Sequence, residues 1–359
     1  MFSQDDKSIY QFNLENKQHH INSIANVCKK NYFYSKQYAG EIEKSFSDLE
    51  NEQNRVLMNI IGHKKLFPQE EDYIYLLTFL TFQFSRTLKF KTYTEDFVQK
   101  AFDEVVKPLM RKAPELKEKG ITDDFIDTLG LEYPALFGRL IATALRSGPL
   151  ISDLEIILLD NKTNLDFIFS DSPVISYNLA YIDSGLSLQG FQSPGLMIFC
   201  PLNEKTLLLL YDPETYRIKK KSKGRIKLRN PNDILEINTL QFVNCYYNVF
   251  YSNKKTEKLI NHIYKSKEKE IVESKNKLME IKRYMRVDGK SELLHFANEK
   301  IDCEISLSFV RITVSGPPEK FVRNPELVEA FEKYIEDDDR ELGLSNSFSR
   351  THKKQMRDA

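Results

Sequence analysis

The chain has 359 residues, of which 41% are hydrophobic, so it can bury one large core together with an appendage or a second domain. Its charge is balanced at 52 basic and 52 acidic residues, which excludes a polyanion-seeking field over the whole molecule. Any affinity for nucleic acid must therefore come from a local cluster of basic residues.

The four cysteines are far apart in the sequence, and none belongs to a C-x-x-C pair or has a His-rich neighbour. This spacing argues against a structural zinc site and favours free thiols in a reducing compartment. No apolar run approaches the roughly 18 residues of a membrane-spanning helix, and the N-terminus lacks the layout of a signal peptide. We therefore expect a cytoplasmic protein without a membrane partner.

A short strand at 8–12 opens the predicted fold, and the polar N-L-E-N segment after it indicates a hairpin. Apolar residues at spacings of three, four and seven then predict a series of helices. These helices cover 41–61, 70–90, 95–112 and 122–146, the last interrupted by Gly130 and Pro134.

The hydrophobic period changes in the middle of the chain. Segments 153–159 and 165–170 flank the turn-rich loop D-N-K-T-N and predict a β-hairpin. Segments 195–200 and 205–211 repeat this pattern around P-L-N-E. Together they predict an antiparallel sheet of about four or five strands packed beneath the helices.

The remaining part of the chain returns to helical periodicity. The predicted elements are a helix at 232–250, a long Lys- and Glu-rich helix at 254–287, a strand at 302–315, a helix at 324–337 and a polar tail at 340–359.

The predicted fold class is therefore α+β. A mostly helical N-terminal half packs on a small antiparallel sheet, and a long helix and a C-terminal strand–helix extension follow it. We expect three parts: an α+β domain at 1–252, a long charged helix at 253–288 and a small C-terminal extension at 289–359.

Two of the predicted helices carry polar residues beside their apolar stripes. Glu43 and Glu50 are seven residues apart, so about 10.5 Å of helical rise separates them on one side of the helix. Gln83 and Arg86 lie three residues apart near the end of the next helix, where Arg86 requires a carboxylate partner, either Glu43 or Glu50. These residues form either structural ion pairs or part of a functional site.

Asp171 ends a predicted strand in the stretch L-D-F-I-F-S-D-S-P, where Pro173 fixes the backbone that follows. A carboxylate held in this way can coordinate a metal ion or act as a base. It can also simply accept backbone N–H groups of the turn.

The stretch at 216–229 is strongly basic and contains no acid. It can bind the phosphates of RNA or DNA, or it is a solvated edge hairpin that turns at Gly224. Its basic residues are Arg217, Lys219, Lys220, Lys221, Lys223, Arg225, Lys227 and Arg229.

Five short motifs follow one another along the chain. They are N-Y-F-Y-S at 31–35, E-I-E-K-S-F-S-D-L-E at 41–50, F-Q-F-S-R at 82–86, F-I-F-S-D-S-P-V at 167–174 and I-F-C-P-L at 198–202 before L-L-L-L-Y-D. In this order they resemble the bacterial family named domain of unknown function 4238, over about residues 7–252. The residues that match the family signature are Glu43, Glu50, Gln83, Arg86, Asp171 and Pro173.

The resemblance supplies no known activity. Members of that family typically begin with a His-Tyr-x-Pro type segment, whereas this chain starts after it. The resemblance does imply that Glu43, Glu50, Arg86 and Asp171 meet at one end of the sheet. Clustered acids with an arginine suit phosphodiester chemistry, because carboxylates hold a divalent cation and a guanidinium stabilises the charge developing on phosphorus.

The leading hypothesis is a metal-dependent nuclease or related hydrolase, of a toxin or phage-defence type. In it, Glu43, Glu50 and Asp171 bind Mg²⁺ or Mn²⁺, while Gln83 orients a water molecule or Arg86. Arg86 stabilises the transition state, and the basic stretch at 217–229 holds the phosphate backbone of the nucleic acid.

The alternative is a non-catalytic module that binds nucleic acid or protein. Glu43, Glu50 and Arg86 then form a structural ion-pair network, and the helix at 254–287 mediates assembly with a second copy or a protein partner. A third hypothesis, a small-molecule or nucleotide hydrolase, predicts a deeper and narrower cavity away from the basic stretch.

Overall fold

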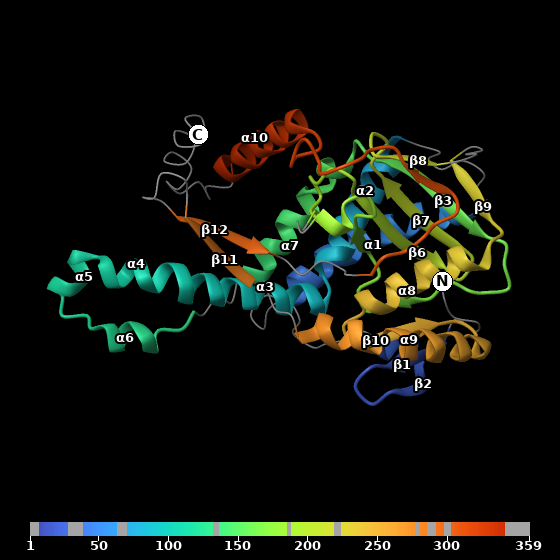
Figure 1. The fold of residues 1–359 in the computed structure, drawn as a ribbon, viewed down its shortest axis with the longest axis horizontal. Helices are drawn as coiled ribbons and strands as arrows, with labels where there is room; N and C mark the ends of the chain where they lie inside the picture. The colour runs from blue at the N-terminus through green and yellow to red at the C-terminus, as the bar shows by residue number, and fades with distance from the viewer. Residues whose placement is uncertain are drawn as a thin grey trace.

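The computed structural model describes residues 7–27, 39–62, 70–131, 136–184, 188–218, 224–276, 280–285, 292–297 and 303–341. Within these ranges, helices are combined with small antiparallel and mixed sheets, which confirms the predicted α+β class (Figure 1).

The helices of the N-terminal half follow a hairpin of two strands. Their bounds are α1 Ala39–Gly62, α2 Glu70–Ser85, α3 Leu88–Ala101, a π-helical turn Phe102–Val106, α4 Lys107–Lys112, α5 Pro114–Glu118, α6 Asp123–Thr128 and α7 Leu136–Arg146. Figure 1 shows α4, α5 and α6 projecting from the body of the molecule. The predicted helix at 122–146 is thus two helices, α6 and α7, on either side of Gly130 and Pro134.

The central sheet has five strands in the order β5-β6-β7-β3-β9. Their bounds are β3 Glu155–Asn161, β5 Ile175–Tyr177, β6 Met197–Asn203, β7 Thr206–Tyr211 and β9 Arg225–Leu228. The predicted hairpin of β6 and β7 is confirmed, with Ile198 opposite Leu210 and Cys200 opposite Leu208. The sheet is mixed, because β9 runs parallel to β3.

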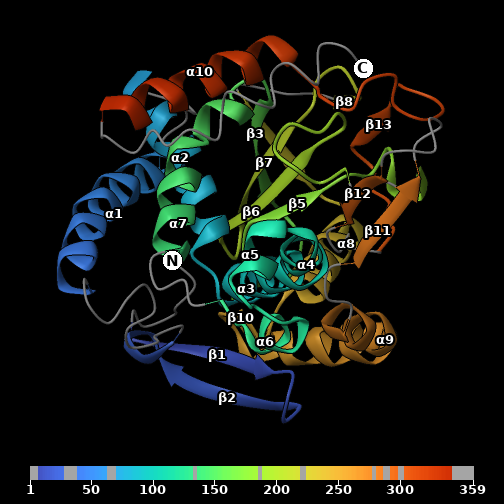
Figure 2. The same cartoon turned by 90° about the vertical axis from the view of Figure 1, so that its left-hand side faces the viewer.

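Both faces of the central sheet are covered, which explains why its central strands β6 and β7 are buried at nearly every position. Leu158, Leu208 and Leu210 pack against α1 and α2. Their neighbours Leu207 and Leu209 point to the other face, where helix α8, Pro231–Asn244, packs. Figure 2 shows α1 and α2 on one side of this sheet and α8 on the other.

A second, antiparallel sheet has the order β2-β1-β10-β4. Its strands are β1 Ser8–Asn13, β2 Gln18–Ser23, β4 Phe169–Ser170 and β10 Asn248–Tyr251. The predicted hairpin of 153–159 and 165–170 is therefore wrong, because its two halves, β3 and β4, belong to different sheets. The predicted helix at 232–250 ends at Asn244, and its last residues form β10 instead.

The long charged helix is shorter than predicted. α9 spans Glu257–Asn276 after a short turn at Lys254–Thr256, and a two-stranded sheet of β11, Glu280–Met285, and β12, Glu292–Ala297, follows it. The final elements are β13, Val310–Ile312, and α10, Pro325–Glu341. β13 pairs with β8, Tyr216–Ile218, so the predicted basic hairpin is also wrong: β8 and β9 have different partners.

The C-terminal extension packs into the main core. Cys303, Ile305, Leu307 and Phe309 are all buried in the cluster that contains α8 and α9, while the residues between them are exposed. The alternation predicted for 302–315 is therefore present in its burial pattern, although only 310–312 are paired as a strand.

Arg323 fixes this extension to the segments that precede β3 and β6. Its side chain is only 5% exposed and forms a bidentate ion pair with Asp153, through Nε at 2.8 Å and Nη2 at 2.7 Å. The same guanidinium also donates to the carbonyl oxygens of Leu150, Phe191 and Ser193. The segment from 303 to 325 is thus held at both ends.

Among the described residues, every helix is too short or too polar to span a lipid bilayer. Cys200, Cys245 and Cys303 are buried, which agrees with the apolar surroundings of these thiols in the sequence, and Cys28 lies outside the described residues.

Candidate functional site

The end of α2 carries the first part of the candidate site. Arg86 follows α2 directly, and its Nη1 forms an ion pair with Glu50 of α1. Its Nε donates to Oε1 of Gln83 at 2.9 Å, and its guanidinium lies 4.6 Å from the ring centroid of Phe82. The predicted contact between Arg86 and Glu50 is therefore present, and Gln83 orients the arginine.

Both members of this ion pair reach the surface. The side chain of Glu50 is 46% exposed and that of Arg86 is 24% exposed. Glu43 lies seven residues earlier on α1, and its side chain is outside the described residues. The described part of this cluster thus contains one carboxylate that is already paired with a guanidinium.

Asp171 forms the second part of the site, at the corner after β4. Its Oδ1 accepts the backbone N–H of Tyr246 at 2.8 Å. Its Oδ2 accepts the N–H groups of Tyr247 at 2.8 Å and of Asn248 at 2.9 Å. The carboxylate therefore satisfies three successive backbone donors where the chain passes from the end of α8 into β10.

The corner containing Asp171 is also held by side-chain amides of α8. Asn238 accepts from the backbone N–H of Ile168 at 3.1 Å. Gln241 accepts from Ser170 and donates to the carbonyl of Pro173 at 2.8 Å. Asn244 donates to the carbonyl of Ser172 at 2.7 Å. These three amides take the place of a neighbouring strand along 168–173.

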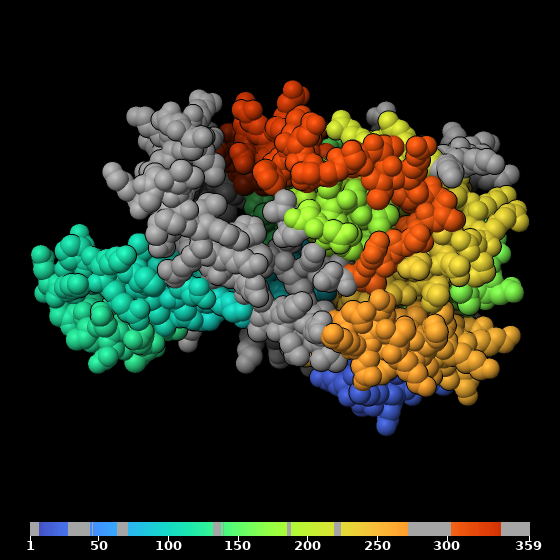
Figure 3. Space-filling view, in the orientation of Figure 1, coloured from blue at the N-terminus to red at the C-terminus, as the bar shows by residue number. Residues whose placement is uncertain are grey.

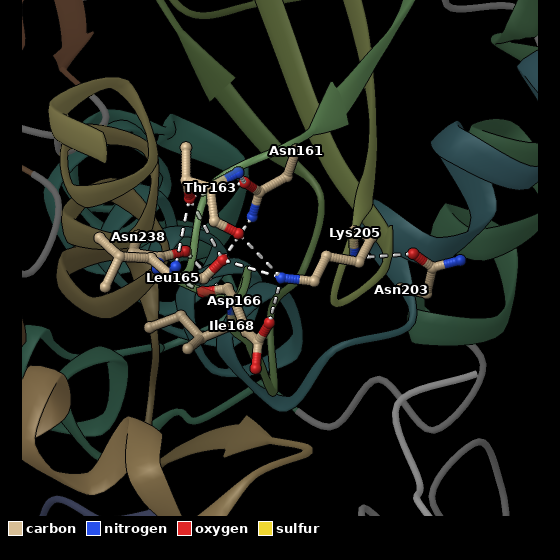
Figure 4. Close-up of polar contacts among 8 residues, drawn as sticks. All are labelled: Asn161, Thr163, Leu165, Asp166, Ile168, Asn203, Lys205 and Asn238. Carbon is tan, nitrogen blue, oxygen red and sulfur yellow. Dashed lines mark hydrogen bonds and ion pairs between the residues drawn. The ribbon is translucent and has the colours of Figure 1, made fainter. Parts of the chain in front are cut away.

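The loop before β4 is fixed by a similar set of contacts around Lys205 (Figure 4). Nζ of Lys205 forms an ion pair with Asp166 at 2.6 Å and donates to the carbonyls of Thr163 and Leu165. The amide of Asn238 donates to the carbonyl of Asp166 in the same group. This network continues the row of α8 amides and prevents the loop from moving independently of the sheet.

Lys89 connects the two parts of the candidate site. It lies three residues after Arg86, and its Nζ donates to the backbone carbonyl of Asn244 at 3.1 Å and to Oδ1 of the same residue at 3.0 Å. Burial raises the pKa of Asp171, while the three backbone N–H groups and the charge of Lys89 oppose this rise. Lys89, near the start of α3, therefore lies close to the Asp171 corner.

The donor set does not favour a metal ion at Asp171. Among the residues that the structure describes, no group of three or more His, Cys, Asp or Glu side chains is placed to share a cation. Asp171 already accepts three hydrogen bonds, out of about four that two carboxylate oxygens can accept. Of the three predicted metal ligands, the side chain of Glu43 lies outside the described residues. Glu50 is paired with Arg86, and Asp171 accepts three backbone N–H groups.

The fold and these contacts set the context for a comparison with known families. The sequence profile of one family, described as a protein of unknown function (DUF4238), matches residues 1–255. The chain belongs to this DUF4238 family. Comparison with curated proteins found no match, and comparison with solved structures found none either. The DUF4238 region contains the Glu50–Arg86 pair and the Asp171 corner, whereas α9 and the C-terminal extension follow it.

The basic residues of the stretch at 216–229 differ in their surroundings. Arg225 forms a bidentate ion pair with Asp160, through Nε at 3.0 Å and Nη2 at 2.6 Å, and it also donates to the carbonyl of Ile60. Lys227 and Arg229 are exposed, and Arg217 is exposed while donating to the carbonyl of Pro213. The side chains of Lys219, Lys220, Lys221 and Lys223 lie outside the described residues.

Sequence reasoning missed Lys89 and the amides of α8. A signal for the amides was present, because Asn238, Gln241 and Asn244 recur every three residues among the apolar residues of the second half of α8. Buried amides must find hydrogen-bond partners, so this spacing predicts a polar segment packed along one side of the helix. Lys89 lacks such a signal, since its partner is a carbonyl distant in the sequence.

Proposed function

We propose that this chain is a non-catalytic nucleic-acid-binding module, in which the family's signature residues hold its helices and strands together. The observation that carries the proposal is the engagement of both carboxylate oxygens of Asp171 by three backbone N–H groups. The residue that the nuclease hypothesis needs most is thus placed as a structural cap.

The chemistry of a metal-dependent nuclease requires carboxylate oxygens that face the cation. Mg²⁺ demands near-octahedral oxygen ligands at about 2.0–2.1 Å, and the three backbone contacts of Asp171 leave its carboxylate about one lone pair for such an ion. Arg86 is likewise held in two directions, by Glu50 and Gln83, before any substrate arrives. These contacts support a role in fixing α1, α2 and the β4 corner.

Nucleic acid is the partner class that the surface charge favours. The whole chain has a net charge of zero, yet exposed cations at Arg217, Lys227 and Arg229 remain on the described part of the basic stretch. Phosphate contacts from such residues supply affinity that does not depend on nucleotide sequence.

The test is incubation of the full-length chain with labelled RNA and DNA in the presence of Mg²⁺, Mn²⁺ or EDTA, scored for both retention and cleavage. The proposal predicts retained and intact nucleic acid under all three conditions. Cleavage that requires the metal ion, and that is lost in Arg86→Gln, would establish the nuclease hypothesis instead. Arg86→Gln is the informative variant because Arg86 is partly exposed, and a thermal melt checks that it is folded. Absence of any retention would refute the nucleic-acid assignment.

A further inference from the structure

Helix α9 presents a row of basic side chains on its outer face. Lys258, His262, Lys265 and Lys269 follow one another at intervals of four, three and four residues, and all four are exposed. Such intervals place side chains on one face of a helix. Lys254, four residues before Lys258 in the preceding turn, is also exposed and continues the row. We call these five residues the α9 basic row.

The opposite face of α9 fixes the helix to the protein. Ile260, Ile263 and Ile271 are at most 3% exposed and belong to the main core. Contacts with the β1–β2 hairpin add to this: Asn261 Oδ1 lies 3.0 Å from Nε2 of His19. Figure 3 shows α9 in orange as a ridge of the surface beside the blue hairpin. The basic row is therefore presented on a rigid support.

Two acidic residues of α9 that neighbour the row are already paired with lysines outside it. Glu268 forms an ion pair with Lys17 at 3.0 Å, and Glu270 forms one with Lys267 at 3.0 Å. Each of these pairs has no net charge, so neither pair reduces the positive charge of the α9 basic row. In a chain of zero net charge, the lysines of the row are therefore a local positive surface.

We propose that the α9 basic row binds the phosphate backbone of double-stranded nucleic acid without reading its sequence. This inference rests on the proposed nucleic-acid function and adds a surface on α9 to the exposed cations at Arg217, Lys227 and Arg229. From Lys258 to Lys269 the helix rises about 16 Å, a straight line of cations that suits the regular phosphates of a duplex.

The composition of the row distinguishes a duplex from other polyanions and partners. Single-stranded nucleic acid is bound by bases stacking on aromatic rings, and the row contains no Phe or Tyr. An anionic membrane surface is bound by helices that also expose large apolar residues, and none of the exposed large apolar residues found in the described part of the chain lies on α9. A symmetric dimer would place the row against itself, where like charges repel.

The expected binding is weak and strongly dependent on salt. If four lysines each neutralise one phosphate of B-DNA, the slope of log affinity against log salt concentration is about −3.6. A rise from 50 to 200 mM salt then weakens binding about 150-fold. Because no base is contacted, duplexes of different sequence should bind alike.

The test is fluorescence anisotropy of a labelled duplex with the full-length protein. The variant combines Lys254→Glu, Lys258→Glu and Lys265→Glu, which reverse three exposed charges of the row. The matched control combines Lys112→Glu, Lys117→Glu and Lys119→Glu, which reverse three exposed lysines on or next to the projecting α4–α6 segment. We expect at least a tenfold loss of duplex affinity and a flatter salt slope in the row variant, and less than a twofold change in the control.

Four outcomes would overturn the proposal. Equal weakening in both variants would show that net charge, and not the row, controls binding. Unchanged duplex binding in a folded row variant would refute the α9 row while leaving the proposed function intact. Tighter binding to single strands or to phosphatidylserine vesicles than to a duplex would assign α9 to one of those partners. A difference in sedimentation coefficient between the wild type and the row variant would instead assign α9 to self-association.

Discussion

Asp171 and Asn248 are joined in both directions. The backbone N–H of Asp171 donates to the carbonyl oxygen of Asn248 at 3.0 Å, and the carboxylate of Asp171 accepts the N–H of Asn248 at 2.9 Å. The first bond extends the pairing of β4 with β10 by one residue, and the second ends it. A single aspartate thus closes one end of a sheet and caps the connection from α8.

Replacement of Asp171 should destabilise the fold. Asp171→Ala leaves three backbone donors without their acceptor, and we expect a loss of about 2–3 kcal/mol in the free energy of unfolding. Asp171→Asn retains one acceptor oxygen and should cost less. Urea denaturation measures the order, with Asp183→Ala at an exposed position as the control. Equal stability of wild type and Asp171→Ala would show that the cap contributes nothing.

The two arginines that join α1 to α2 should have unequal effects. Arg55 Nη1 forms an ion pair at 3.1 Å with Oδ1 of Asp72, whose side chain is 1% exposed, and the described residues offer this carboxylate no further hydrogen-bond donor. Arg55→Gln therefore leaves a buried carboxylate unpaired, so it should lower the free energy of unfolding by more than Arg86→Gln does. Arg86→Gln removes a pair whose acid is 46% exposed and should cost about 1 kcal/mol or less. Thermal melts of the two variants would contradict this account if Arg86→Gln proved the more damaging.

The C-terminal extension should be required for folding of the family region. Arg323→Lys keeps the charge but cannot reproduce the bidentate pair with Asp153 together with three carbonyl contacts, so we expect a loss of about 3 kcal/mol. Arg311→Lys, at an exposed position, is the control and should be neutral.

A chain cut after residue 255 should lack a cooperative unfolding transition by circular dichroism. A cooperative transition at the wild-type temperature would show that the extension is dispensable.

Cys200 should be inert in the folded protein. Burial raises the pKa of its thiol from 9.0 to about 12, so the fold favours the protonated form. The associated stability is fully present below pH 9 and is lost as the pH rises through about 12. Alkylation by iodoacetamide at pH 9, followed by mass spectrometry of the Cys200 peptide, should be slow in the native protein and fast in urea. Similar rates in both states would refute this burial.

Local patterns predicted elements well where partners are adjacent in the sequence. The β6–β7 hairpin follows from two apolar runs around P-L-N-E, and both strands are adjacent in the sheet. The same kind of pattern failed for 153–159 and 165–170, because β4 pairs with β10, about eighty residues later. Apolar periodicity identifies a buried strand but does not identify its partner.

The candidate site was predictable in part. A partly exposed helical arginine requires an acid, and Glu50 is the acid that Arg86 meets. The role of Asp171 depends on the backbone of 246–248, and a sequence pattern gives no indication of which donors a distant turn presents. The end of α9 was misplaced for a similar reason, since charged residues continue from the helix into β11 without a change of composition.

The central claim is that the Asp171 carboxylate is a structural cap and not a metal ligand. Amide hydrogen exchange at Tyr246, Tyr247 and Asn248 tests this most directly, measured by NMR with and without millimolar Mn²⁺. The account predicts three protected amides whose exchange and line widths do not change on addition of the metal ion. Selective broadening of these three signals by Mn²⁺, or exchange as fast as in an unfolded chain, would contradict it.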